Sequence, residues 1–124
     1  MASSIGGITS NIIGFALDGL SLRHQAIASN IANADVAGYR PVKVSFEDTI
    51  AAVQNESIHS ADSALFDMTP SVSYGPPISG DSNRAALETE IVLLNQNVIQ
   101  YQSLIKGLEK YKAAIAEAIK EGRR

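Results

Sequence analysis

The sequence predicts a mainly α-helical protein, in which two long antiparallel helices at the two ends of the chain form a coiled-coil-like hairpin. Three observations predict this fold. Apolar residues recur at helical spacing in both end segments, no proline occurs from about residue 84 to 121, and the segment between the helices is rich in turn residues. The chain has 124 residues, and a domain usually takes roughly 100 to 200. We therefore expect a single domain over residues 1–124.

The N-terminal helix is expected over about residues 8–33, and its apolar residues form two overlapping stripes. Phe15 belongs to the first stripe, and Leu20 and Ile27 belong to the second. A helix that is apolar on two faces needs a partner on each face. The C-terminal helix can cover one stripe, and the middle segment looks too short to cover the other. The remaining apolar surface therefore predicts contact with other subunits.

Glycine residues should weaken this N-terminal helix, by up to about 1 kcal/mol each relative to alanine. The glycines of this region are Gly6, Gly7, Gly14 and Gly19.

Residues 34–83 are expected to be a long and largely irregular connection, because glycine and proline recur along them. Val42, Val44 and Phe46 alternate with polar residues, which is typical of a short strand. Residues 46–53 have room for one or two helical turns. A long irregular connection is unusual inside a compact domain. We therefore expect this segment either to wrap around a neighbouring subunit or to be held by one.

The C-terminal helix is expected over residues 84–121, and its apolar spacing is the strongest signal in the sequence. Steps of four and three residues alternate over more than four heptads, as in the seam of a coiled coil. The predicted seam consists of Leu87, Ile91, Leu94, Val98, Tyr101, Ile105, Leu108, Ile115 and Ile119, with Lys112 as the polar exception.

The end of the N-terminal helix carries two asparagines, Asn30 and Asn33. Their amides can bond backbone groups where a helix ends, and the small residues around them permit close approach of another element. Gly38 follows at the position that most needs a positive φ. Taken alone, this pattern is that of an ordinary helix C-terminus.

The composition argues against several kinds of site. Thirteen acidic and ten basic residues give a net charge of −3, without the basic cluster that nucleic-acid binding usually requires. Cysteine is absent, which excludes disulfides, thiolate-bound metals and a thiol nucleophile. His24 and His59 have no second ligand at suitable spacing. We therefore expect no catalytic site, no metal, no cofactor and no small-molecule substrate.

The first residues do not form a cleavable secretory signal, because no basic residue precedes Arg23 and polar residues interrupt the apolar run. We expect that any export uses another route.

Two stretches of the chain resemble flagellar basal-body rod proteins. Residues 20–46, LSLRHQAIASNIANADVAGYRPVKVSF, resemble the N-terminal signature of that family, and residues 81–115, DSNRAALETEIVLLNQNVIQYQSLIKGLEKYKAAI, resemble its C-terminal helix. Val36 and Ala37 replace the Thr and Pro that many relatives carry, so the turn lacks the rigid φ of proline. The motif residues to which the resemblance gives a subunit-contact role are Leu20, Arg23, Ile27, Ala28, Ser29, Asn30, Ile31, Ala32, Asn33, Gly38 and Tyr39.

The resemblance implies a structural subunit of the bacterial flagellar rod, most similar to its proximal members, that assembles helically and transmits torque. It implies contacts with other copies, with other rod proteins, with a basal adaptor and with membrane-ring and export-gate components. It also implies a place in the rod within the periplasmic space, after type III export. The alternative is a soluble helical binding module or export chaperone, which would bury its apolar stripes against one client.

Overall fold

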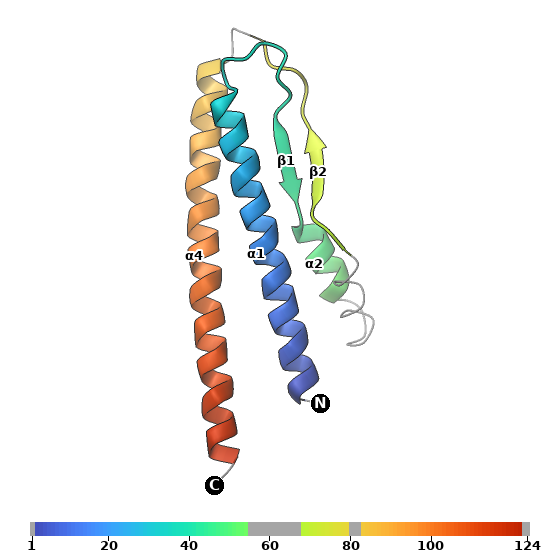
Figure 1. The fold of residues 1–124 in the computed structure, drawn as a ribbon, viewed down its shortest axis with the longest axis vertical. Helices are drawn as coiled ribbons and strands as arrows, with labels where there is room; N and C mark the ends of the chain where they lie inside the picture. Colours follow the sequence, from blue (N-terminus) through green and yellow to red (C-terminus); the bar gives the residue numbers. More distant parts are fainter. Residues whose placement is uncertain (1, 55–67, 80–82, 123–124) are drawn as a thin grey trace.

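The protein is mainly helical, as the computed structural model of residues 2–54, 68–79 and 83–122 shows (Figure 1). In this described part of the chain, two long helices and one short helix accompany a two-stranded sheet. In chain order the elements are α1 (Ala2–Ala32), β1 (Val42–Ser45), α2 (Glu47–Gln54), β2 (Ser71–Tyr74) and α4 (Asn83–Gly122).

Helix α1 is the central element of the molecule. Helix α4 packs along one side of α1 and runs in the opposite direction, while β1 and α2 pack on its other side (Figure 1). Strand β2 pairs with β1 and lies farther from α1. Both stripes of α1 are therefore covered within one chain over part of its length.

The sheet is a single antiparallel pair, with Val42 opposite Tyr74 and Val44 opposite Val72. Residues that lie opposite each other share one face of a sheet. Val44 on that face is buried against α1, whereas Val72 and Tyr74 are exposed. The inner face of β2 thus extends beyond the cover that α1 provides.

One apolar core joins the layers. Phe15, Ala16 and Leu20 of α1 pack with Phe46 and Val53 from the middle segment. Leu104 of α4 adds partly buried surface to the same cluster. The expectation that the middle segment could not cover the stripe that the C-terminal helix leaves open is wrong, because Phe46 and the fully buried Val53 pack in the core with Phe15 of the first stripe.

The expected boundaries need two corrections. Helix α1 begins at Ala2 rather than near residue 8, since a glycine cost of about 1 kcal/mol weakens a helix without ending it. The connection over residues 34–83 is also less irregular than expected. The strand at Val42–Ser45 and the helical turns after it are present, and the sheet partner Ser71–Tyr74 was not expected.

The seam of α4 is also shifted from the predicted one. Leu94 and Leu108 are half-buried, as members of the α1-facing stripe should be, but Ile91 and Val98 are exposed. Asn97 takes the place expected for Val98, because its amide Nδ2 donates a hydrogen bond of 2.8 Å to the carbonyl oxygen of Leu20 in α1. The residues at heptad spacing around it, all half-buried or buried, are Glu90, Leu94, Asn97, Leu104, Leu108 and Tyr111.

Candidate functional site

The motif residues lie at the corner where α1 ends and β1 begins. Asn33 Nδ2 and the backbone N–H of Asn33 both donate to the carbonyl of Ser29, at 2.8 and 3.0 Å. The side chain of Asn33 thus gives this carbonyl of the last helical turn a second donor, beside the ordinary helical N–H. The helix-end function expected for Asn33 is therefore present.

A tight turn follows over residues 36–39. The N–H of Tyr39 donates to the carbonyl of Val36 at 3.2 Å, and Gly38 has a φ of +84°. No other described residue has a positive φ, so this is a type II turn with glycine at its third position. The expectation that Gly38 needs a positive φ is confirmed.

Asn30 fastens the strand to the helix. Its Nδ2 donates to the carbonyl of Val42 at 2.9 Å, and its Oδ1 accepts from the N–H of Val42 at 2.8 Å. The hydroxyl of Tyr39 donates to the same Oδ1 at 2.9 Å and lies 3.0 Å from the hydroxyl oxygen of Ser29. Asn30 is buried, so its amide serves the strand backbone of its own chain rather than the helix end.

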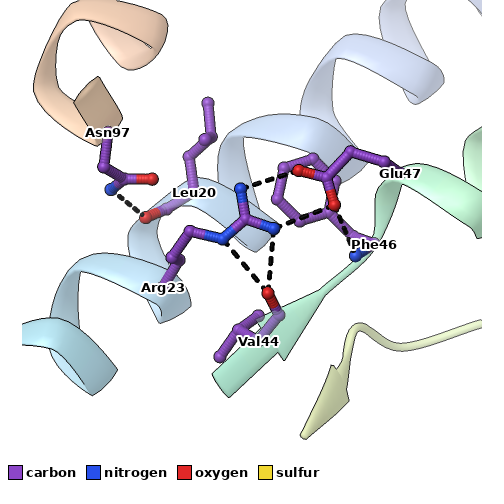
Figure 2. Close-up of polar contacts among 6 residues, drawn as sticks. All are labelled: Leu20, Arg23, Val44, Phe46, Glu47 and Asn97. Atoms are coloured by element: carbon purple, nitrogen blue, oxygen red, sulfur yellow. Dashed lines mark hydrogen bonds and ion pairs between the residues drawn. The ribbon is translucent and has the colours of Figure 1, made fainter. Parts of the chain in front are cut away.

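Arg23 makes the second attachment, one heptad before Asn30 (Figure 2). Its Nε and Nη2 donate to the carbonyl of Val44 at 3.1 and 2.8 Å. Its Nη2 and Nη1 also meet the carboxylate oxygens of Glu47 at 2.8 and 2.7 Å. The guanidinium carbon lies 4.6 Å from the centre of the Phe46 ring, in cation–π contact. One side chain thus holds β1, the start of α2 and a core aromatic ring.

The hydrogen bond from Arg23 lowers the pKa of Glu47 from 4.5 to about 2, and the N–H of Phe46 adds a donor to the same carboxylate. Glu47 also opens α2, where an acidic residue is favoured by the helix dipole.

Together, Asn30 and Arg23 occupy the edge of β1 that faces α1. A strand edge offers alternating N–H and C=O groups, and here the groups of Val42 and Val44 are bonded by helix side chains. The other edge of β1 pairs with β2. β1 therefore has bonding partners along both of its edges.

Gly19 is a residue whose role the sequence did not reveal. A Cβ at this position would lie 2.4 Å from Cδ1 of Phe46. Phe46 in turn packs edge-on against Phe15, with ring centres 6.5 Å apart. Only a residue without a Cβ lets the ring sit against α1. The available signal was an isolated glycine inside an apolar helix, which usually has a packing reason.

The predicted site residues do not form one cluster. In the N-terminal motif, Leu20, Ile27 and Asn30 are buried, while Arg23, Ser29, Ile31, Asn33 and Tyr39 are half-buried and Ala28, Ala32 and Gly38 are exposed. In the predicted seam, Leu87, Leu94, Ile105 and Leu108 are half-buried, while Ile91, Val98, Tyr101, Ile115 and Ile119 are exposed. The exposed members are available to other chains, and their contact role stays a prediction.

The described residues contain no cluster of metal-binding side chains. No group of three or more His, Cys, Asp or Glu side chains in the described ranges could hold a metal ion. His24 is exposed, and His59 lies outside the described residues. Within residues 2–54, 68–79 and 83–122, no helix is both long and apolar enough to cross a membrane.

Comparison with known families gives a match over the end of α1 and the turn that follows it. The family model described as flagella basal body rod protein matches residues 16–40, which run from the core of α1 through the turn that contains Gly38. Comparison with curated proteins gives no match. The family match supports a structural component of the flagellar basal-body rod, located in the basal body, rather than an enzyme.

Proposed function

We propose that this chain is a structural subunit of the bacterial flagellar rod, of the proximal FlgB type, that assembles helically and transmits torque. The pairing of α1 and α4 as a coiled-coil-like hairpin is part of this proposal. So are export through the type III apparatus without a cleavable signal and a place in the periplasmic part of the rod. Its partners are further copies, other rod proteins, a basal adaptor and components of the membrane ring and export gate.

The observation that carries the proposal is where the family match falls. Residues 16–40 contain Arg23 and Asn30, whose side chains fix the position of β1 against α1. The stretch that matches the rod-protein family therefore contains, in this chain, the helix residues whose side chains bond the backbone of β1. A corner held in this way sets the shape of a subunit, and torque transmission needs subunits of fixed shape.

The exposed apolar surface of α4 supports the assembly part of the proposal. Ile91, Val98, Ile99 and Ile119 are among the large apolar side chains exposed along this helix. Burying a large aliphatic side chain is worth about 1.5 to 3 kcal/mol, so a row of them favours association. Exposed apolar rows of this kind mark contact surfaces.

The decisive experiment compares two aspartate variants in cells of the source bacterium. Ile91→Asp adds a carboxylate to the exposed apolar row, and Ser103→Asp adds one to an exposed polar position of the same helix. Both should leave the fold of the single chain intact. We expect Ile91→Asp to abolish motility and remove the chain from purified basal bodies, because an unpaired charge would be buried between subunits. Ser103→Asp should assemble normally.

A different outcome would count for the alternative function. If the wild-type chain is absent from basal bodies and forms a stable, closed complex with one soluble client, it is a binding module or export chaperone. Normal motility of cells that carry Ile91→Asp would show that this row of α4 does not contact other subunits.

A further inference from the structure

A groove opens between α4 and β2, with α1 as its floor. It has a volume of about 570 Å³. Ala26 and Ile27 lie at the floor, Tyr74 belongs to the wall on the sheet side, and Glu90 and Leu93 belong to the wall on the helix side. Tyr74 and Leu93 are 59% and 41% exposed, although both are large and apolar in character. The groove thus runs beside α4 and combines apolar side chains with charged ones, among them Arg23, Lys43 and Glu90.

Two acceptor atoms of the groove lack donors. Oε2 of Glu90 and Oδ1 of Asn97 are buried and have no hydrogen-bond partner in the described part of the chain. Asn97 is 3% exposed, and its Nδ2 is already used by Leu20. Buried acceptors are normally paired, because leaving one unpaired costs stability. An occupant of this groove should therefore carry hydrogen-bond donors beside apolar side chains.

The C-terminal end of α4 has these properties. Because Asn97 meets Leu20 and the two helices run in opposite directions, the last turns of α4 lie beyond the start of α1 at Ala2. Figure 1 shows this end projecting past the N-terminus. Since Asn97 is level with Leu20, Ile115 is level with Ala2 and Ile119 lies beyond it. These two side chains are 37% and 54% exposed.

Two lysines accompany these isoleucines. Lys112 lies three residues before Ile115, on the same face of the helix, and Lys120 directly follows Ile119. Both lysines are exposed. Lys112 is the polar residue that interrupts the predicted apolar seam, and in the single chain it faces no carboxylate that would explain it among the described ion pairs.

We propose that the C-terminal end of α4, from Lys112 onward, of a second copy of this chain lies in the groove, parallel to the α4 that forms its wall. An offset of about 22 residues, or roughly 33 Å at 1.5 Å per residue, places Lys112 of the second copy beside Glu90. The same offset places Ile115 beside Leu93 and Ile119 beside Asn97. The lysines supply donors to the unpaired acceptors, and the isoleucines cover the apolar wall.

This contact has a direction. The groove lies near the end of the molecule where α4 begins. The C-terminal end of α4 lies at the opposite end of the molecule (Figure 1). One copy therefore offers its groove to the next copy along the helix axis. Head-to-tail contacts that do not close generate filaments. This contact names the surfaces through which two copies meet in the proposed rod assembly. Its biological role rests on the proposed function.

Disulfide cross-linking tests the contact, because the natural chain has no cysteine. Leu93→Cys combined with Ile115→Cys places two thiols about 33 Å apart on one rigid helix, too far for a bond within one chain. Mild oxidation of the purified chain at high concentration should give a ladder of dimers, trimers and longer species. The matched control is Ile99→Cys with Ile115→Cys, since Ile99 is exposed but does not line the groove.

A charge exchange gives the second measurement. Adding Lys112→Glu to the Leu93/Ile115 cysteine pair should remove the ladder, and adding Glu90→Lys as well should restore it. The contact is overturned if the Leu93/Ile115 pair gives no ladder, if the Ile99 control gives an equal one, or if only closed dimers form. The circular dichroism spectrum of each variant should match that of the unsubstituted chain. Because the Ile99 control carries the same Ile115→Cys change, the two double variants differ only in the position of the second cysteine.

The same variants separate this inference from the proposed function. If the cysteine variant enters basal bodies and supports motility but gives no ladder there or in solution, the contact is wrong and the rod function stands. If the ladder forms in solution but the wild-type chain is absent from basal bodies, the contact stands and the rod function is wrong.

Discussion

Replacing Gly19 by alanine should destabilise the fold, although alanine is the better helix former. Alanine in place of glycine usually stabilises a helix interior by about 1 kcal/mol. At Gly19, however, the new Cβ would lie 2.4, 2.5 and 2.9 Å from three ring atoms of Phe46. That ring cannot move away freely, because it lies between Phe15 and the guanidinium of Arg23.

The two effects can be compared in magnitude. Overpacking of a filled core costs about 1 to 3 kcal/mol, so the net effect of Gly19→Ala is a loss of about 0 to 2 kcal/mol. Gly14→Ala is the matched control in the same helix, because nothing lies within 4 Å of a Cβ placed there. It should raise stability by up to about 1 kcal/mol.

The assay is urea unfolding of the purified chain followed by far-UV circular dichroism. Gly19→Ala should lower the midpoint and Gly14→Ala should raise it. The double variant Gly19→Ala with Phe46→Leu should lose less stability than the sum of the two single changes, since the smaller side chain relieves the clash. Equal stabilisation by Gly19→Ala and Gly14→Ala would refute the reasoning, because Phe46 could not then be seated against Gly19.

Three further predictions concern the corner between α1 and β1. The pKa of Glu47 is about 2 in the folded chain against an ordinary 4.5, so its bond with Arg23 stabilises the fold above about pH 4.5 and is lost as the pH falls toward 2. Arg23→Gln should raise that pKa toward 4.5 in an NMR titration, and an unchanged value would contradict this origin. Ala37→Pro should stabilise the chain by about 0.4 to 1 kcal/mol, because the second position of a type II turn suits proline, whereas Gly38→Val should cost at least about 1 kcal/mol. Urea unfolding checks both, and the opposite order would reject the turn assignment. Asn30→Ala should lower the free energy of unfolding by roughly 1 to 3 kcal/mol, because it leaves an N–H and a C=O of the strand without partners. It should also speed hydrogen exchange of the first amide of β1. Unchanged exchange would show that the hydrogen bonds of the Asn30 side chain are not formed.

Local signals in the sequence predicted the helices and the turn well. The spacing of apolar residues predicts the long helix α4. The position of Gly38 just after the end of α1 predicts its positive φ. Asn33 was likewise expected to bond the end of α1. These features depend on residues a few positions apart, so a short stretch of chain contains the cause of each.

Features that depend on distant partners were predicted poorly. β2 contains Val72 and Tyr74 among serines, and only its pairing with β1 makes this segment a strand. The seam of α4 was displaced because apolar character favoured Val98, whereas a hydrogen bond to α1 places Asn97 there. A pattern of apolar residues cannot identify a polar side chain that is buried because it donates a hydrogen bond to a carbonyl on another helix.

The bonds that hold α1 differ greatly in the length of chain that each one closes, and this difference sets an order of folding. Asn30 reaches Val42 across 12 residues, whereas Asn97 reaches Leu20 across 77. Closing the longer loop costs about 1.6 kcal/mol more in chain entropy, from the logarithmic dependence on loop length. We therefore expect the corner to form first and α4 to dock last. An element that docks last, against a surface that is identical in every copy, is the element most easily exchanged between neighbouring chains. At high concentration we therefore expect domain swapping in which copies of this chain exchange α4.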